Sequence, residues 1–117
     1  MQALTREVKH LHAKVAIGAS GAPTLDSDIS VGVASITRDS AGVYILTLDD
    51  AYNSLVDFSV MQLAASAEDL TFQIESESVA SAKTIQFQCK AAAVETDPSN
   101  GSTLLIKVAL KNTSVAR

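Results

Sequence analysis

Hydrophobic and polar residues alternate with a period of two over most of this 117-residue chain. Successive side chains of a strand point to opposite faces of a sheet, so this alternation predicts strands with one buried face. The clearest examples, with apolar residues at every second position, are 11–17, 70–75, 85–90 and 104–110. A weaker alternation over 56–63 places Val56, Phe58 and Val60 on one side. The chain is therefore predicted to be a β protein.

Turn-forming residues mark where these strands reverse. The segments 31–37 and 43–48 are rich in β-branched residues, which favour strands, and the residues between them are typical of turns. We therefore predict a hairpin between residues 31 and 48. Residues 96–101 include a proline and an Asn-Gly pair, which favour a tight reversal. We expect the strand 104–110 to pair with the strand 85–89 across this turn.

Three other segments are less regular. Residues 18–30 are predicted to be a loop, because Pro23 lacks a backbone donor and glycine weakens strands. Asp49 and Asp50 are helix-capping residues, and they predict a single helical turn that ends at Leu55. The tract 91–94 either extends the strand before it or bends it.

About seven short strands without helical periodicity predict one all-β domain, an antiparallel β-sandwich or barrel. Alternation alone fits either architecture. Because the loop 18–30 separates the first strand from the others, we expect residues 1–30 to form an N-terminal arm and residues 31–117 to form the sandwich. Such an arm would lie at an edge or reach a neighbouring subunit. Its predicted partner contacts are Leu4, Val8, Leu11, Val15, Ile17, Pro23 and Leu25.

Composition narrows the classes of function. The net charge of −4 argues against a protein that binds the nucleic-acid backbone, which requires a basic surface. Charged residues interrupt positions 1–11, and no apolar run reaches membrane-spanning length, so we expect synthesis in the cytoplasm and no membrane partner. The single cysteine, Cys89, alternates with Ile85 and Phe87 and is predicted to lie in the core.

Candidate chemistry is sparse in the sequence. On a strand, His10 and His12 project from the same face, as two metal ligands would, but no third ligand is near them in sequence. Exposed or interface histidines are the interpretation that we favour. The acidic residues fall on polar faces or at strand edges, as solvated charges do. We therefore predict no enzyme activity, no metal, no cofactor and no small-molecule substrate.

Two stretches carry a resemblance to a known class of proteins. Residues 32–48 read GVASITRDSAGVYILTL, which fits the pattern G-[IV]-A-S-[IV]-x-R-x-S-x-G-x-Y-x-[VL]-T-L. Residues 96–106 read TDPSNGSTLLI and contain a turn similar to TDPxxGT. Both resemble small β-rich virion structural proteins of tailed bacteriophages, of the capsid decoration or cement type. These motifs are a hairpin and a turn, so they imply a β building block and carry no catalytic residue.

The resemblance implies a decoration protein that binds the outer capsid surface and stabilises the shell. Its partners would be the major capsid protein and itself, as a homo-dimer or homo-trimer, and its location would be the virion after synthesis in the host bacterium. The alternative is a tail-tip or fibre-associated receptor-binding or adhesion module, since similar hairpins occur at fibre tips. A low aromatic content of 4% counts against that alternative. A bacterial enzyme or small-ligand binder is a third, weaker option.

Overall fold

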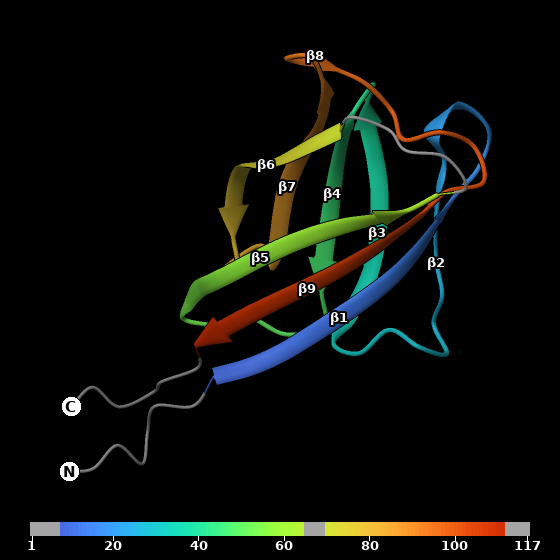
Figure 1. Ribbon diagram of the computed structural model, residues 1–117. Helices are drawn as coiled ribbons and strands as arrows, with labels where there is room; N and C mark the ends of the chain where they lie inside the picture. Colours follow the sequence, from blue (N-terminus) through green and yellow to red (C-terminus); the bar gives the residue numbers. More distant parts are fainter. Residues whose placement is uncertain (1–7, 65–69, 112–117) are drawn as a thin grey trace, which may run out of the picture.

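The computed structural model describes residues 8–64 and 70–111, which form two antiparallel sheets packed as a β-sandwich (Figure 1). Sheet A has the strand order β2-β1-β9-β5, and sheet B has the order β3-β4-β7-β6 with the short β8 paired to β7. The predicted all-β class is confirmed. The strands are β1 (Val8–Ile17), β2 (Pro23–Leu25), β3 (Val33–Ser40), β4 (Val43–Leu48), β5 (Ser54–Leu63), β6 (Leu70–Ser78), β7 (Thr84–Ala91), β8 (Val94–Glu95) and β9 (Thr103–Lys111).

One core lies between the two sheets, and in β1, β7 and β9 every second residue contributes to it. The predicted alternation is confirmed in β1, β7 and β9, whose inward residues are almost fully buried. In β6, Phe72 and Ile74 are partly buried and pack against this core. Cys89 is fully buried, as predicted. The largest fully buried side chains include Tyr44, Phe87, Leu46, Leu48, Ile85, Leu104, Ile106 and Leu110.

The strand β5 departs from the simple alternation near its start. The pairing register with β9 shifts between Leu55 and Asp57, so Val56 is an extra residue in a β-bulge. As a result Leu55 packs against the core and Val56 is 53% exposed. The prediction that Val56 lies on the same side of the strand as Phe58 and Val60 is therefore wrong, because a bulge changes which residues face inward.

The predicted pairing of 104–110 with 85–89 is also wrong. β9 pairs with β1 and β5 in sheet A, whereas β7 pairs with β4 and β6 in sheet B. Residues 96–102 therefore carry the chain from one sheet to the other instead of reversing it within one sheet (Figure 1). The alternation in each strand shows that one face is buried, but it does not identify the neighbouring strand.

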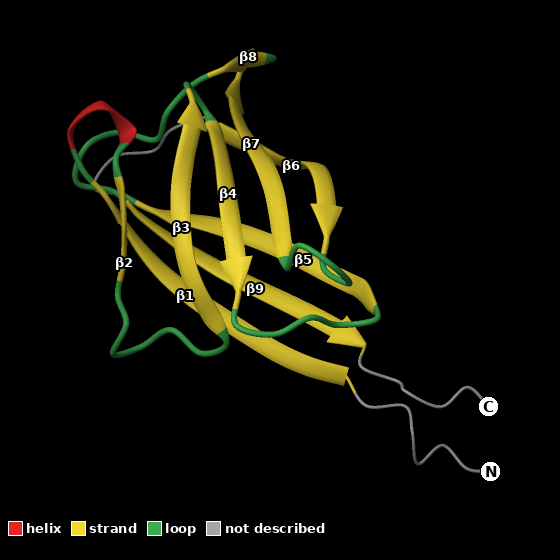
Figure 2. Ribbon diagram, turned by 180° about the vertical axis from the view of Figure 1, so that it is seen from behind, coloured by secondary structure: helices red, strands yellow, loops and turns green. Residues whose placement is uncertain are grey.

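Two of the irregular segments take definite forms. The expected helical turn after Asp50 is absent: Leu55 already belongs to β5, and the Tyr52 N–H donates to the Val79 carbonyl oxygen at 2.9 Å. The tract 91–94 bends, because Ala92 and Ala93 have positive φ angles of 51° and 69° and reverse the chain between β7 and β8. The one helical segment among the described residues is the 3-10 turn η1 (Ala19–Gly21), coloured red in Figure 2.

The described part of the predicted N-terminal arm belongs to the sandwich. β1 lies between β2 and β9, and Pro23 begins the edge strand β2. Because β1 is an inner strand, the structure corrects the division of the chain into an arm of residues 1–30 and a separate sandwich. Across residues 8–64 and 70–111, no helix has the length and apolar character needed to span a membrane.

The predicted contact residues of the arm have different surroundings. Leu11, Val15 and Ile17 are at most 6% exposed and are covered by the core of this same chain, so they cannot serve as an exposed contact surface in this fold. Val8 is exposed, Pro23 and Leu25 are partly buried, and Leu4 lies outside the described residues.

Candidate functional site

Three loops meet at one corner of the sandwich, which we call the loop corner (Figure 2). They are residues 18–22, the β3–β4 turn at 41–42, and residues 96–102. Backbone hydrogen bonds join the end of β1, which leads into the first loop, to the third loop: the Gly101 N–H donates to the Ile17 carbonyl oxygen at 2.8 Å and the Ile17 N–H donates to the Ser102 carbonyl oxygen at 2.9 Å. The corner thus joins segments that are far apart in sequence.

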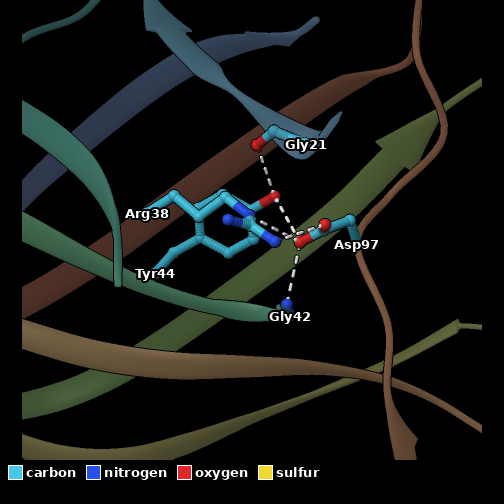
Figure 3. Close-up of polar contacts among 5 residues, drawn as sticks. All are labelled: Gly21, Arg38, Gly42, Tyr44 and Asp97. Atoms are coloured by element: carbon cyan, nitrogen blue, oxygen red, sulfur yellow. Dashed lines mark hydrogen bonds and ion pairs between the residues drawn. The ribbon is translucent and has the colours of Figure 1, made fainter. Parts of the chain in front are cut away.

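Asp97 is at the centre of the polar contacts of the loop corner (Figure 3). Arg38 donates from Nε to Oδ1 at 3.0 Å and from Nη2 to Oδ2 at 2.8 Å, and the Gly42 N–H donates to Oδ1 at 2.8 Å. The Tyr44 hydroxyl donates to the Gly21 carbonyl oxygen at 2.7 Å and lies 3.4 Å from Oδ1 of Asp97. We call Arg38, Gly42, Tyr44 and Asp97 the polar clasp.

The electrostatics of the polar clasp favour a charged aspartate and a neutral tyrosine. The hydrogen bond from Arg38 is the main cause that lowers the pKa of Asp97, with the Gly42 N–H acting in the same direction and burial opposing it. Burial, followed by the charge of Asp97, raises the pKa of Tyr44 well above its usual range. The Asp97 carboxylate already accepts hydrogen bonds from Arg38 and from the Gly42 N–H. This geometry is typical of a charged group that holds one loop against another.

The positions of Gly21 and Gly42, which lie against Asp97 and its loop, require glycine. Gly21 has a φ of +75°, and a Cβ there would lie 2.4 Å from Cγ of Asp97. Gly42 has a φ of +73°, and a Cβ there would lie 2.6 Å from the Cys89 carbonyl oxygen. Any other residue would combine backbone strain with a steric clash, so close loop packing depends on both glycines.

The polar clasp unites the two stretches that carry the resemblance to phage virion proteins. Arg38, Gly42 and Tyr44 occupy the fixed R, G and Y positions of the hairpin pattern, and Asp97 is the aspartate of the TDP turn. Sequence reasoning singled out both stretches but missed that their side chains meet. The sequence signal for this contact was the presence of both motifs in one chain. Two motifs in one sequence do not show whether they lie close together in the fold.

The two histidines that were weighed as metal ligands lie on the outer face of sheet A. A hollow of about 210 Å³ there is lined by His10, His12, Asp57, Ser59 and Lys107, among others. Within residues 8–64 and 70–111, no three His, Cys, Asp or Glu side chains come together as a metal site. The structure therefore places both histidines at the surface, beside a lysine.

A second hollow lies between the two sheets, where the edge strands β5 and β6 face each other. This β5–β6 opening has a volume of about 450 Å³ and is lined by Phe58, Ser59, Val60, Leu70, Thr71, Phe72, Gln73 and Ile74. Among the strands of residues 8–64 and 70–111, β5 is paired only with β9 and β6 only with β7, so within this part of the chain each strand has one unpaired edge here. Four of its apolar side chains are partly buried and pack against the core, namely Phe58, Val60, Phe72 and Ile74.

Comparison of the chain with models of protein families, with curated proteins and with solved structures found no match in any of the three.

Proposed function

We propose that this chain is a bacteriophage virion structural protein of the capsid decoration type, which binds the outer capsid surface and stabilises the shell. The observation that carries the proposal is the polar clasp, because the two stretches that resemble virion proteins form one structural unit through Arg38 and Asp97. A resemblance confined to unrelated surface loops would give no reason for these polar positions to meet. The sandwich fold agrees with the β building block that the resemblance implies.

A decoration protein acts by burying surface between itself and shell subunits, so it needs a rigid framework and an exposed docking surface. The core and the polar clasp supply the framework, since they hold both sheets and three loops together. Exposed apolar side chains on the strands of sheet A, such as Met61 and Leu105, supply surface that is available for docking. In this role the chain would assemble as a dimer or trimer, which native mass spectrometry measures directly.

The copy number per virion tests this proposal. Purified particles are analysed by quantitative mass spectrometry, with the major capsid protein as the internal reference. A ratio comparable to that of the shell subunit supports a decoration protein. A handful of copies would instead assign the chain to the neck, tail or fibre, as in a receptor-binding module. Absence from particles would refute a virion role altogether.

Particle stability provides a functional test of the same proposal. Particles assembled without the protein should release DNA at a lower temperature than complete particles, because the missing contacts no longer hold neighbouring shell subunits. Addition of the purified chain should restore the higher temperature. A release temperature that does not depend on the protein would contradict a stabilising role, even if the copy number is high.

A further inference from the structure

The outer face of sheet A has an ordered arrangement of side chains across β5, β9 and β1. The strand register places Met61, Leu105 and Lys14 in one cross-strand row. The next row contains Ser59, Lys107 and His12. Directly opposed residues point to the same face of an antiparallel sheet, so these side chains form a continuous surface.

This face is unusually apolar for an exposed surface. Of the eight large hydrophobic side chains that are exposed in the described part of the chain, five lie on it. Met61 is 69% exposed and Leu63 is 58% exposed. The five are Val8, Val31, Met61, Leu63 and Leu105. Clustered exposed apolar residues indicate a surface that binds another molecule.

The outer face of sheet B has a different composition. Its central strand β7 points Thr84, Gln86 and Gln88 outward, and Gln86 donates to Glu75 of the neighbouring β6 at 2.7 Å. These uncharged polar side chains are typical of a sheet face that contacts water. The contrast shows that exposed apolar side chains are concentrated on one of the two sheets.

Charge is also unevenly distributed. The strands β1, β5 and β9 contain four lysines and one aspartate, a formal charge of +3, although the whole chain has a net charge of −4. Three of these lysines, Lys14, Lys107 and Lys111, lie on the outer face with the aspartate, Asp57. The strands of sheet B carry Arg38 and Lys90 against four acidic residues, a formal charge of −2. Sheet A is therefore locally basic on an acidic protein.

We propose that the outer face of sheet A docks a protein surface that presents carboxylates beside apolar side chains. The inference rests on the proposed function and names the face that would contact the shell. Apolar partner groups would cover Met61, Leu63 and Leu105, while carboxylates would pair with Lys107 and Lys14. Complementary charge of this kind speeds association and fixes orientation.

The side chains around the hollow are compatible with this pairing. Lys107 and the two histidines line the 210 Å³ hollow on this face, and among the described residues Asp57 is the one acidic group that lines it. The Asp57 carboxylate accepts the Phe58 N–H at 2.9 Å, so it is already engaged with its own backbone. Asp26, whose backbone N–H donates to the Lys14 carbonyl oxygen at 2.9 Å, likewise accepts a backbone N–H on its carboxylate, that of Asp28, at 3.1 Å.

Two other occupants fit this face less well. A second copy docked face to face around a two-fold axis would bring the lysines of one face toward those of the other, and like charges in contact are unfavourable. A nucleic acid would neutralise the lysines but would leave the exposed apolar side chains without apolar partners. A protein surface with acidic and apolar groups satisfies both kinds of side chain.

The test measures binding of the purified full-length chain to shells from particles assembled without it. Lys107→Glu and Met61→Ser change the outer face of sheet A. Matched controls on sheet B are Lys90→Glu, the same charge change on β7, and Val94→Ser, an apolar residue that is 64% exposed. We expect each sheet A variant to weaken binding by about tenfold or more, and each control to stay within about twofold of the parent chain.

Each outcome has a definite meaning. Parent binding that is lost only in the sheet A variants supports the inference. Parent binding that survives Lys107→Glu and Met61→Ser, or that is lost equally in the controls, overturns the inference and leaves the decoration role standing. A parent chain that does not bind shells overturns both.

Two further measurements address the other occupants. Native mass spectrometry would overturn the inference if the parent chain is an oligomer that Met61→Ser dissociates, because the face would then be a self-interface. Binding of duplex DNA at physiological salt that Lys107→Glu abolishes would overturn it in favour of a nucleic acid. We expect the variants to have the same number of subunits as the parent chain. We also expect the parent chain not to bind duplex DNA.

Discussion

The loop corner and the β5–β6 opening are held together by different means. At the corner, Asp97 accepts directed hydrogen bonds from Arg38 and Gly42, and the Tyr44 hydroxyl donates to the Gly21 carbonyl oxygen of the first loop. At the opening, partly buried side chains such as Phe58 and Phe72 contact the core between β5 and β6, two strands that the described residues leave unpaired on one edge. Phe87 reaches toward both regions, with ring centroids 5.8 Å from Tyr44 and 5.3 Å from Phe58.

This difference shows how a sandwich can close firmly in one region and remain accessible in another. Polar contacts at the corner depend on exact positions, since a hydrogen bond weakens quickly with distance and angle. Apolar contacts at the opening tolerate small shifts, because burial of apolar surface has no direction. We therefore expect substitutions at the corner to be more disruptive than substitutions of similar size at the opening.

The largest expected effect compares two phenylalanines. Phe87→Ala should reduce the free energy of unfolding by about 3–5 kcal/mol, because the ring is fully buried and its removal leaves a cavity. Phe72→Ala should reduce it by only about 1–2 kcal/mol, because Phe72 lines the opening and is partly exposed. Urea unfolding monitored by circular dichroism measures both. Equal losses would show that the opening is as tightly packed as the core.

A second prediction compares two glycines with positive φ. Gly42→Ala should reduce stability by about 2 kcal/mol or more, since it adds a clash with the Cys89 carbonyl oxygen to the backbone strain. Gly101→Ala has the same kind of strain but no atom within 4 Å of the new Cβ, and should cost about 1 kcal/mol. Thermal unfolding of both variants measures the difference. A harmless Gly42→Ala would mean that the loop corner is loosely packed.

The third prediction concerns acid. Because the pKa of Asp97 is lowered in the folded chain, its contribution to stability is complete above its ordinary value of 3.8 and is lost as the pH falls through the lowered pKa. Asp97→Asn replaces the carboxylate by a neutral amide, so the variant should be less stable than the parent at neutral pH, where the parent's Asp97 is charged. The difference in melting temperature should shrink as the pH falls below 3.8. A difference that does not depend on pH would refute a charged Asp97 in the clasp.

The smallest expected effect is a gain in stability. Ala92 and Ala93 adopt left-handed conformations that alanine disfavours, whereas an Asn-Gly pair suits such a two-residue reversal. The double variant Ala92→Asn, Ala93→Gly should stabilise the chain by about 1 kcal/mol and strengthen the β7–β8 reversal that leads into the loop corner. Thermal unfolding measures the gain. Destabilisation would contradict the assigned turn.

Much of the fold was predictable because strand alternation is a local property. The inward positions of β1 and β9, including Leu11 and Leu104, follow from residues two apart in sequence. The hairpin of β3 and β4 was predictable for the same reason, since its turn lies between adjacent strands. The loop 18–30 was placed correctly as a break after β1, although a short part of it, β2, pairs back onto that strand.

The parts that were missed depend on contacts between distant residues. The bulge that exposes Val56 arises from the register between β5 and β9, which no local pattern specifies. Arg38 and Asp97 are 59 residues apart, so the motif turn and the hairpin gave no sign that they touch. β1 was expected to be an arm because a loop follows it, but strand order within a sheet does not follow the order of loops in the sequence.

The sequence alone determined the all-β class, the faces of the main strands and the burial of Cys89, because each depends on the period of two between neighbouring side chains. Only the tertiary structure decided that β9 lies between β1 and β5, that three loops meet at Asp97, and that apolar and basic side chains share the outer face of sheet A. A residue's own strand sets the direction of its side chain, whereas its neighbours on adjacent strands depend on how the whole chain closes.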